Sequence, residues 1–528
     1  LLYRTTSAKL APGQALLYKP DEFFEIVLLQ SGNEVSYSWM AQPTCLTLST
    51  ESGSSLRFIF GDLDTILFKA QGVSLRLIPC KVFPLEYSPN PQQIVLLDWA
   101  ARGFHYFRSP ENAQVHAGIT KTTTGLEHHG HEYPYTIDFS GSMGAIRFSE
   151  YEHPWNEPFP DFDTALSDRE REFTAWAKRM PAVPETYQAS AAQAWFILWN
   201  CLVPPVGSLT RPAIYMSKAC MNGIWAWDNC FNALAVIKAD PALAWDQIRL
   251  FFDHQESLGM LPDMVSDLEP VYGFTKPPVY GWAIQKLIQA QGLKKALPYL
   301  NEIYKPLIRL TEWWYKNRDF DGDGIPQYHH GNDSGWDNAT VFDQGCPTEG
   351  ADLAAYLVIQ CETIAQIATA LDHRKSAIRW HERSQIQLSR LLELQVKKGR
   401  FFSPRDGQST AAPSHSLLNT TPIVLGNRLP AQVRNNLVQD LGPEGPFLTN
   451  FGLATEAPSS PKYISDGYWR GPIWAASTYL IFDGLLSAKE SNLAYTIAER
   501  FCNLCLRSPG FWENYDALTG QGLRCPGY

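Results

Sequence analysis

The hydrophobic pattern of this 528-residue chain changes its period near residue 161, which separates two parts with different predicted secondary structure. Before this point, VSLRLIP (73–79) alternates apolar and polar residues, as a half-buried strand does. LRFIFGD, QIVLLDW, YTIDFSG and AIRFSEY repeat the pattern between clusters of Gly, Pro, Asn and Ser. Many short strands separated by turn signals predict an antiparallel β-sandwich domain over residues 1–155.

The part after the change is predicted to be helical. DFDTALSDREREFTAWAKRMP reads as a charged helix, so residues 156–184 are expected to form a helical linker. Asp240 followed by Pro241 is typical of an N-cap with proline at the first helical position. Further helices fit near residues 279–291, 295–317, 349–371, 374–396, 472–486 and 490–507. Paired helices with long aromatic loops favour an α/α toroid over residues 185–528, although the pattern alone does not separate a toroid from a superhelical array.

Charge and hydropathy restrict the partners of the chain. The net charge is −10, from 44 Lys and Arg against 54 Asp and Glu, and no block of basic residues is present. This argues against nucleic acid or an anionic membrane and fits a neutral oligosaccharide or small glucoside as substrate. No uninterrupted apolar run reaches the roughly 20 residues that cross a membrane. The opening residues LLYRTTSAKLAPGQ lack the pattern of a signal peptide, which slightly favours the cytoplasm, and the oligomeric state stays open.

Four predicted loops combine acidic and aromatic residues. They are GIWAWDNCF (223–231), SGWDN (334–338), DGYWRGPIW (466–474) and FWENYDALTG (511–520). Each loop adjoins a predicted helix, and in a helical toroid such loops converge on one end of the central cavity. Much of the aromatic content, which includes 17 Trp residues, is expected to lie in the core, but indole rings are also surfaces on which the apolar faces of sugars pack.

Hydrolysis of a glycosidic bond needs two carboxyl groups across the scissile bond. The general acid must hold its proton near neutral pH, and an apolar neighbour such as Trp336 favours this for Asp337. Glu513, between Trp512 and Asn514, is the natural second carboxylate. Taken alone, an aspartate in such a Gly-rich loop is more often a helix cap or a turn residue.

Together, SGWDN, WAWDNCF, YWRGPIW and WENYDALTG resemble the clan of glycoside hydrolase family 63, the processing α-glucosidases, and the trehalases. The resemblance covers residues 185–528 and implies an (α/α)6 barrel, an inverting mechanism, Asp337 as general acid and Glu513 as general base. The residues that it assigns to the substrate pocket are Trp225, Asp228, Phe231, Trp336, Asn338, Trp469, Arg470 and Trp474. Trp282, at the start of a predicted helix, is expected either to face the same cavity or to pack behind it.

The resulting prediction is an exo-acting inverting α-glycosidase, most simply an α-glucosidase that releases terminal glucose. The carboxyl groups of Asp337 and Glu513 should then lie ~6.5–9.5 Å apart. A sugar phosphorylase is an alternative, but it needs a phosphate site where Glu513 supplies an acid. A non-catalytic carbohydrate-binding protein could dispense with both carboxylates. A polysaccharide lyase would prefer acidic polymers, for which a chain of net charge −10 is poorly suited.

No cofactor is expected, and one weak candidate for a metal site stands out. In RDFDGDGIP (318–326), Asp319, Asp321 and Asp323 alternate as in a calcium loop. The twelfth position of that loop is His330, where twelve-residue calcium loops place a glutamate, so a turn is the favoured interpretation. HHGHE (128–132) does not match HExxH and is interpreted as a surface loop.

Overall fold

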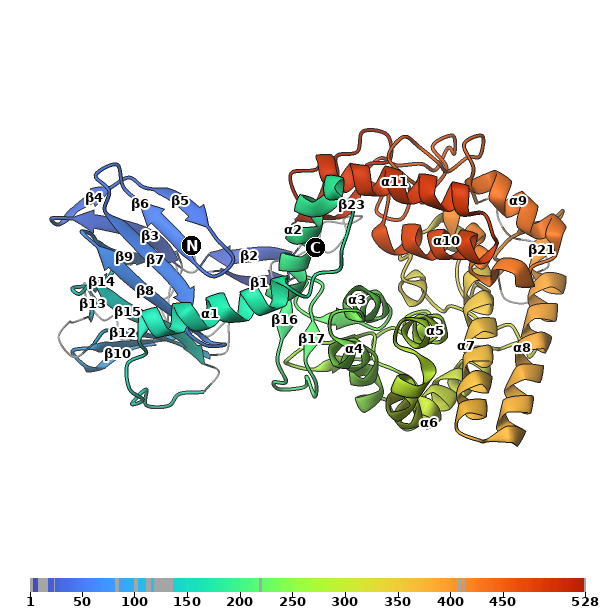
Figure 1. The fold of residues 1–528 in the computed structure, drawn as a ribbon, viewed down its shortest axis with the longest axis horizontal. Coiled ribbons are helices and arrows are strands. Elements are labelled where there is room, and N and C mark those ends of the chain that lie inside the picture. Colours follow the sequence, from blue (N-terminus) through green and yellow to red (C-terminus); the bar gives the residue numbers. More distant parts are fainter. Residues whose placement is uncertain are drawn as a thin grey trace. The chain divides into compact units, whose positions relative to one another are not determined.

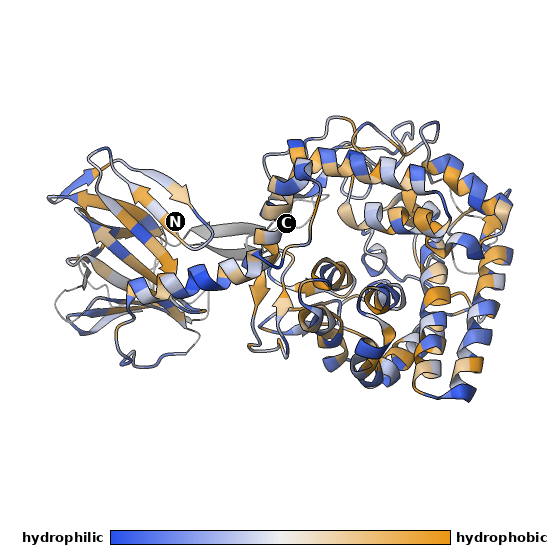
Figure 2. Ribbon diagram, in the orientation of Figure 1, coloured by the Kyte–Doolittle hydropathy of each residue, from blue (hydrophilic) through white to orange (hydrophobic). Residues whose placement is uncertain are grey.

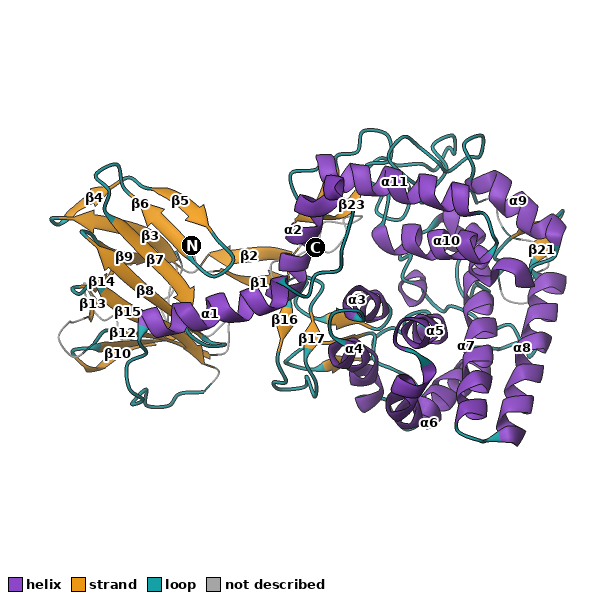
Figure 3. Cartoon of the chain, in the orientation of Figure 1, coloured by secondary structure: helices purple, strands orange, loops and turns teal. Residues whose placement is uncertain are grey.

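The structure is a computed structural model. It describes residues 3–7, 18–22, 24–80, 85–98, 103–110, 115–117, 136–149, 151–217, 221–405, 408, 411 and 414–526. The HHGHE segment lies outside these residues. The chain divides into two compact units. They comprise Leu1–Thr6 with Lys19–Arg179, and Ser7–Tyr18 with Met180–Tyr528. Figure 1 and Figure 3 show that strands dominate the first unit and helices the second.

The first unit contains two antiparallel sheets, which confirms the predicted antiparallel architecture of this region. The eight-stranded sheet has the order β10 (Leu85–Asn90), β11 (Gln93–Asp98), β12 (Gly103–Arg108), β15 (Met143–Ser149), β8 (Thr65–Gln71), β7 (Ser55–Phe60), β6 (Leu46–Ser49), β5 (Ser38–Ala41). The five-stranded sheet has the order β13 (Val115–Ala117), β14 (Ile137–Phe139), β9 (Ser74–Pro79), β3 (Phe24–Gln30), β4 (Asn33–Val35). Separately, β1 (Tyr3–Ser7) pairs with β2 (Tyr18–Glu22).

The two large sheets share one hydrophobic core. Leu75 and Leu77 of β9 are fully buried in it, whereas Ser74 and Arg76, which alternate with them, are only partly buried. Leu56 of β7 is buried in the same core from the other sheet. Figure 2 shows the corresponding hydrophilic and hydrophobic bands along the strands. The alternation in the sequence therefore corresponds to one face of each strand turned towards this core.

The charged helix predicted from the sequence is α1 (Phe162–Ala177), and it belongs to the first unit. The side chain of Asp161 caps its N-terminus by accepting a hydrogen bond from the Thr164 amide at 2.8 Å. Phe162 and Trp176 are its buried residues, and Phe162 packs in a second core cluster of the first unit. Ala165 and Leu166 pack against the same cluster, and charged side chains such as those of Glu170 and Arg171 are exposed.

The second unit is a helical domain. Its α-helices are α2 (Gln188–Asn200), α3 (Asp228–Val236), α4 (Pro241–Asp253), α5 (Tyr280–Gln291), α6 (Leu293–Asn317), α7 (Ala351–Ala370), α8 (Arg374–Leu394), α9 (Ala431–Leu441), α10 (Ala475–Ser487) and α11 (Ser491–Arg507). Its 3₁₀ segments are η1 (Glu185–Tyr187), η2 (Gly331–Ser334), η3 (Thr340–Gln344) and η4 (Leu417–Arg428). Its short strands are β16 (Leu202–Val203), β17 (Ala213–Ile214), β18 (Ile224–Trp225), β19 (Met264–Val265), β20 (Pro270–Val271), β21 (Val396–Lys397), β22 (Arg400–Phe401), β23 (Trp512–Tyr515) and β24 (Gly522–Pro526).

These helices form two layers. In one layer, α3, α5, α7, η4 and α10 contact one another in that succession. In the other, α8, α9 and α11 pack on α7, η4 and α10, whereas α4 packs on both α3 and α5, and α6 on both α5 and α7. By length and composition α7 could span a membrane, but most of its residues are buried inside the domain, as in a core helix of a globular protein.

The predicted cap of α4 is confirmed. The carboxylate of Asp240 accepts a hydrogen bond from the Leu243 amide at 3.0 Å, and Pro241 occupies the first turn. Farther along the same helix, the side chain of Gln247 accepts a hydrogen bond from the Ile214 amide at 2.9 Å. The cap thus stabilises the start of α4, and the hydrogen bond to Gln247 links the helix to strand β17.

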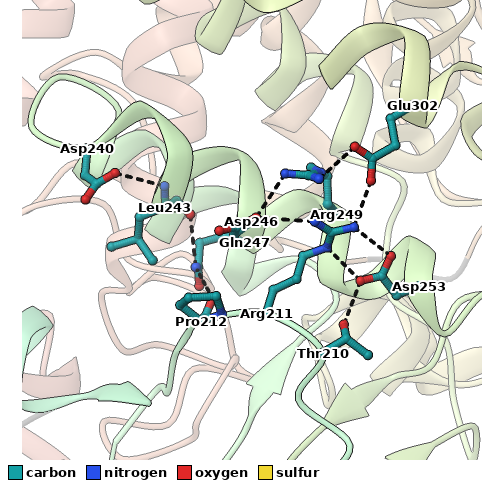
Figure 4. A network of polar contacts seen from close by, with 10 residues as sticks. All are labelled: Thr210, Arg211, Pro212, Asp240, Leu243, Asp246, Gln247, Arg249, Asp253 and Glu302. Atoms are coloured by element: carbon teal, nitrogen blue, oxygen red, sulfur yellow. Dashed lines mark hydrogen bonds and ion pairs between the residues drawn. The ribbon is translucent and has the colours of Figure 1, made fainter. Parts of the chain in front are cut away.

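An ionic network holds the segment before β17 against α4 and α6 (Figure 4). The guanidinium of Arg211 donates to Asp253 at 2.7 Å and to Glu302 at 2.8 Å. Arg249 lies 2.7 Å from the other oxygen of Glu302 and 3.1 Å from Asp246. The arginine side chains are mostly buried, which protects the network from screening by solvent.

We expect Arg211→Ala to lower the free energy of unfolding by about 2 kcal/mol, because it removes hydrogen bonds to two carboxylates. Thermal and denaturant unfolding would measure the loss. Arg374→Ala is the matched control, since Arg374 pairs with Asp372 on the surface, where both side chains are more than four-fifths exposed. It should leave stability nearly unchanged. Equal effects of the two variants would contradict a stabilising role for the network.

Candidate active site

The second unit contains a cavity of about 690 Å³ into which three carboxylates project. They belong to Asp228, Asp337 and Glu513. The aromatic side chains that line the cavity are Trp225, Trp227, Phe231, Tyr468, Trp469, Trp474, Tyr479, Phe482, Phe501, Phe511 and Tyr215. Helices α2, α3, α10 and α11 add mainly apolar side chains to the wall. Segments far apart in the sequence therefore meet around a small group of acids.

Of the two aspartates in the GNDSGWDN loop, Asp333 has a structural role. Its side chain is 1% exposed. One carboxylate oxygen accepts hydrogen bonds from Arg318 at 2.7 Å and from the His329 amide at 2.9 Å, and the other accepts from the Thr275 amide at 3.1 Å. Asp333 thereby fixes the loop, and Asp337 is left as the carboxylate that reaches the cavity.

Two glycines allow this loop to fold so tightly. A Cβ on Gly331 would lie 1.9 Å from the carbonyl oxygen of Asp337, so no larger residue fits there. Gly335 has a φ of +73°, and a Cβ at this position would meet the ring of Trp227 at 2.5 Å. Gly331 therefore lets the backbone of Asp337 approach closely, and Gly335 lets the loop pack against Trp227.

Trp336 and Trp282 lie behind the wall of the cavity and not on its surface. Trp336 is fully buried, and its ring packs 4.6 Å from that of Trp469 between centroids. Trp282 is 2% exposed and donates from its indole to Asp483 at 2.8 Å. For Trp282 this is one of the two expected placements, the one behind the cavity. The predicted contact of Trp336 with the sugar does not match its placement, because its ring is enclosed by other side chains. Trp469, by contrast, lines the cavity.

Asn338 and Arg470 join the two loops that carry Asp337 and Trp469. The Asn338 side chain accepts a hydrogen bond from the Trp469 amide at 2.9 Å and donates to the Gly467 carbonyl at 3.0 Å. Arg470 donates to the Asn338 carbonyl at 2.7 Å and pairs with Asp343. Neither is among the described residues that line the cavity, so both are placed to position the wall and not to contact a ligand.

Glu513 lies on β23 and is 7% exposed. The hydroxyl of Tyr468 donates a hydrogen bond to its carboxylate at 3.1 Å. Burial raises the pKa of Glu513 to about 7, against the hydrogen bond from Tyr468 and the positive charge of Arg524, which lower it. The negative charge of Asp337 raises it further.

Burial also raises the pKa of Asp337, while the positive charge of Lys276 lowers it. Burial thus raises the pKa of both carboxyl groups, and the negative charge of Asp337 raises that of Glu513 further, so these surroundings favour a proton on one of the two. One protonated and one ionised carboxyl group is the combination that glycoside hydrolysis requires.

The sequence did not predict two polar residues that face the carboxylates of the site. Tyr468, which bonds to Glu513, has a φ of +65° within the YWRGPIW segment. Lys276 lines the cavity and lies 3.2 Å from the carboxylate of Asp263. The strained φ of Tyr468 has no signature in the sequence. Lys276 stands directly before two prolines, which is the one local sign that its backbone is held in place.

The aspartates of the predicted calcium loop do lie together. One oxygen from each of Asp319, Asp321 and Asp323 lies within 4.8 Å of the others. The Gly324 amide donates to Asp319 at 3.1 Å and the Ile325 amide to Asp323 at 2.7 Å, so the loop closes as a turn through its own backbone. A cation here stays a prediction from the sequence.

Removal of the Tyr468 hydroxyl should shift the acidic limb of the pH profile of kcat/KM. In Tyr468→Phe the carboxylate of Glu513 loses a stabilising hydrogen bond, so its pKa rises and a base at this position gains its proton at higher pH. We expect the acidic limb of kcat/KM to move up by about one pH unit. Tyr479→Phe, which removes a hydroxyl from the same cavity on α10, is the control and should leave that limb in place. An unmoved limb in Tyr468→Phe would contradict the role of this hydrogen bond.

Several known glycoside hydrolases are similar to this chain in sequence or in fold. A profile described as the Mannosylglycerate hydrolase MGH1-like glycoside hydrolase domain matches residues 221–528. Mannosylglycerate hydrolase MGH1 of Selaginella moellendorffii is 21% identical over 379 residues, 56% of this chain and 76% of that protein. A mannosylglycerate hydrolase of Thermus thermophilus is 22% identical over 382 residues, 58% of this chain and 91% of that protein. The structure of a GH63 mannosylglycerate hydrolase from Thermus thermophilus with glucose aligns with a TM-score of 0.54 and 22% identity, over 64% of this chain and 96% of that chain.

Proposed function

This chain belongs to the family of MGH1-like glycoside hydrolases, and we propose that it is an exo-acting enzyme that hydrolyses a terminal α-linked hexose with inversion. The observation that carries this proposal is the pairing of Asp337 and Glu513 in one cavity, both with raised pKa values. An (α/α)6 barrel is the proposed architecture of the helical domain. The two layers of paired helices and the likeness of fold to the GH63 structure support it.

In the proposed reaction, Asp337 donates its proton to the leaving oxygen while Glu513 removes a proton from the attacking water. Attack from the face opposite the leaving group then inverts the anomeric centre. Trp225 and Trp469 supply faces for the sugar ring, and Asp228 is placed to accept hydrogen bonds from its hydroxyls. A sugar phosphorylase is disfavoured, because the anionic Glu513 would repel the phosphate that such an enzyme must bind.

The aglycone is proposed to be neutral, with an α-glucoside as the preferred substrate. Lys276 is the only lysine or arginine among the described residues that line the cavity, and it already pairs with Asp263. An anionic substrate would therefore enter a cavity with an excess of negative charge. Mannosylglycerate, which the names of the relatives suggest, is the second candidate and carries a carboxylate.

Proton NMR of the purified protein with a panel of α-glucosides and with mannosylglycerate tests the proposal. Initial release of the β-anomer is expected from an α-linked substrate, before mutarotation mixes the two forms. Initial release of the α-anomer would rule out inversion. If mannosylglycerate is the only compound hydrolysed, the aglycone is anionic and not neutral, and the proposed acid–base mechanism is unaffected.

A further inference from the structure

Lys276 is a buried cation inside the proposed active site. It follows β20 and precedes α5, and its side chain is 8% exposed. Its side chain lines the same cavity as Asp337. Because a lysine is costly to bury without compensating partners, its surroundings must supply negative charge and hydrogen-bond acceptors.

The contacts of Lys276 join two parts of the site. The ammonium nitrogen lies 3.2 Å from the carboxylate of Asp263 and donates to the Asn332 carbonyl at 2.6 Å. The Asp263 carbonyl in turn accepts a hydrogen bond from the Ala226 amide at 2.9 Å, next to Trp225 at the end of β18. Asn332 lies in η2, at the start of the loop that carries Asp337. Through Asp263 and Asn332, the side chain of Lys276 thus connects Trp225 in the cavity wall with the loop of the proposed general acid.

The charges that face Lys276 come from three elements. Asp228 lies at the start of α3, Asp263 immediately before β19, and Asp337 after η2, and all three raise the pKa of Lys276. Lys276 therefore remains protonated. Asp337 is also faced by His330, which precedes η2, and by Glu513 on β23. Without the ammonium group, these carboxylates would meet no lysine or arginine among the described lining residues.

We propose that Lys276 is a positioning residue for the proposed general acid: it clamps the loop that carries Asp337 to the β18–β19 segment and supplies the positive charge that faces the Asp337 carboxylate. This inference rests on the proposed function. It concerns the alkaline limb of the pH profile, because a general acid is inactive once ionised. Glu513, the proposed base, governs the acidic limb.

Lys276→Met tests the proposal. The ammonium group lowers the pKa of Asp337, so its removal raises that pKa and keeps the acid protonated to higher pH. We expect the alkaline limb of kcat/KM to move up by about one pH unit, with kcat lowered at every pH because the loop is no longer clamped. A residue with only a structural role would lower kcat and leave the limb in place.

Asp263→Asn supplies a second test, in which the alkaline limb is expected to shift in the opposite direction. It also keeps the proposal testable if Lys276→Met does not fold. Removal of the Asp263 charge leaves Lys276 less neutralised and takes away a carboxylate near Asp337, so the pKa of Asp337 falls. The alkaline limb should then move to lower pH. Lys286→Met is the matched control. It breaks a partly buried pair with Asp483, so it should lower stability and leave the limb unmoved.

Opposite shifts in the Lys276 and Asp263 variants would support the proposal. An alkaline limb that stays at its wild-type position in every folded variant of the two would overturn it, and so would shifts in the same direction. Failure of the proposed function would give a different result, because Asp337→Asn would then keep nearly normal activity. If Asp337→Asn is inactive but the alkaline limb stays in place in the Lys276 and Asp263 variants, only the proposed role of Lys276 is wrong.

Discussion

Asp337→Asn is expected to lower kcat by about 10³-fold while the affinity for substrate stays close to that of the wild type. The amide preserves the shape of the carboxyl group but has no acidic proton to give to the leaving oxygen. Asp333 and the two glycines of the loop, which hold its backbone, are untouched by the change. Steady-state kinetics, with calorimetric titration of a substrate into the inactive variant, would measure both quantities.

The choice of substrate sharpens this prediction. An α-glycosyl fluoride releases fluoride, which leaves without being protonated, so Asp337→Asn should recover much of its activity on it. Asp333→Asn is the matched control from the same loop. It breaks a buried ion pair with Arg318, so it should lower stability and activity on both substrates alike. Near-normal hydrolysis of ordinary glycosides by Asp337→Asn would remove this residue from the mechanism.

The loop of Asp337, the proposed acid, could be predicted from the sequence because the residues around Asp337 in space are partly its neighbours in the chain. Gly331, Gly335 and Trp336 all surround Asp337 within one loop. The direction of each side chain could not be predicted. Trp336 turns into the core and packs on Trp469, a contact between distant loops that no local pattern encodes.

The residues that sequence analysis missed act through such distant contacts. Lys276 and Tyr468 each approach a carboxylate that lies far from them along the chain. Lys276 belongs to no motif with defined spacing. Tyr468 opens the YWRGPIW segment, but nothing in that segment indicates that its hydroxyl bonds to Glu513. Only the folded structure shows that both are directed into the cavity.

At the level of the fold, long periodic segments could be predicted and short irregular ones could not. The alternation in β9 and the cap of α4 are visible in the sequence. The 3₁₀ segment η4 was not predicted as part of the helical layer, because Pro422 and Gly426 interrupt its pattern. The two-residue strands β18 and β19 are too short to show any period, although they carry Trp225 and adjoin Asp263.

Glu513→Gln is expected to lower kcat by about 10³-fold, like the change at Asp337, but with a different response to the leaving group. The amide cannot remove a proton from the attacking water, and this step is needed whichever group departs. The glycosyl fluoride should therefore give no recovery in this variant. Its hydrogen bond from Tyr468 can still form with the amide oxygen, so the fold around β23 should be kept.

The two variants together decide the assignment of roles. If Asp337 is the acid and Glu513 the base, only the Asp337 variant recovers on the fluoride; recovery of the Glu513 variant alone would exchange the two roles. Burial does not separate the two groups, since it raises the pKa of both. The neighbours do not separate them either: Lys276 lowers the pKa of Asp337, and Tyr468 and Arg524 lower that of Glu513. The response to the leaving group therefore decides which carboxyl group gives a proton and which takes one.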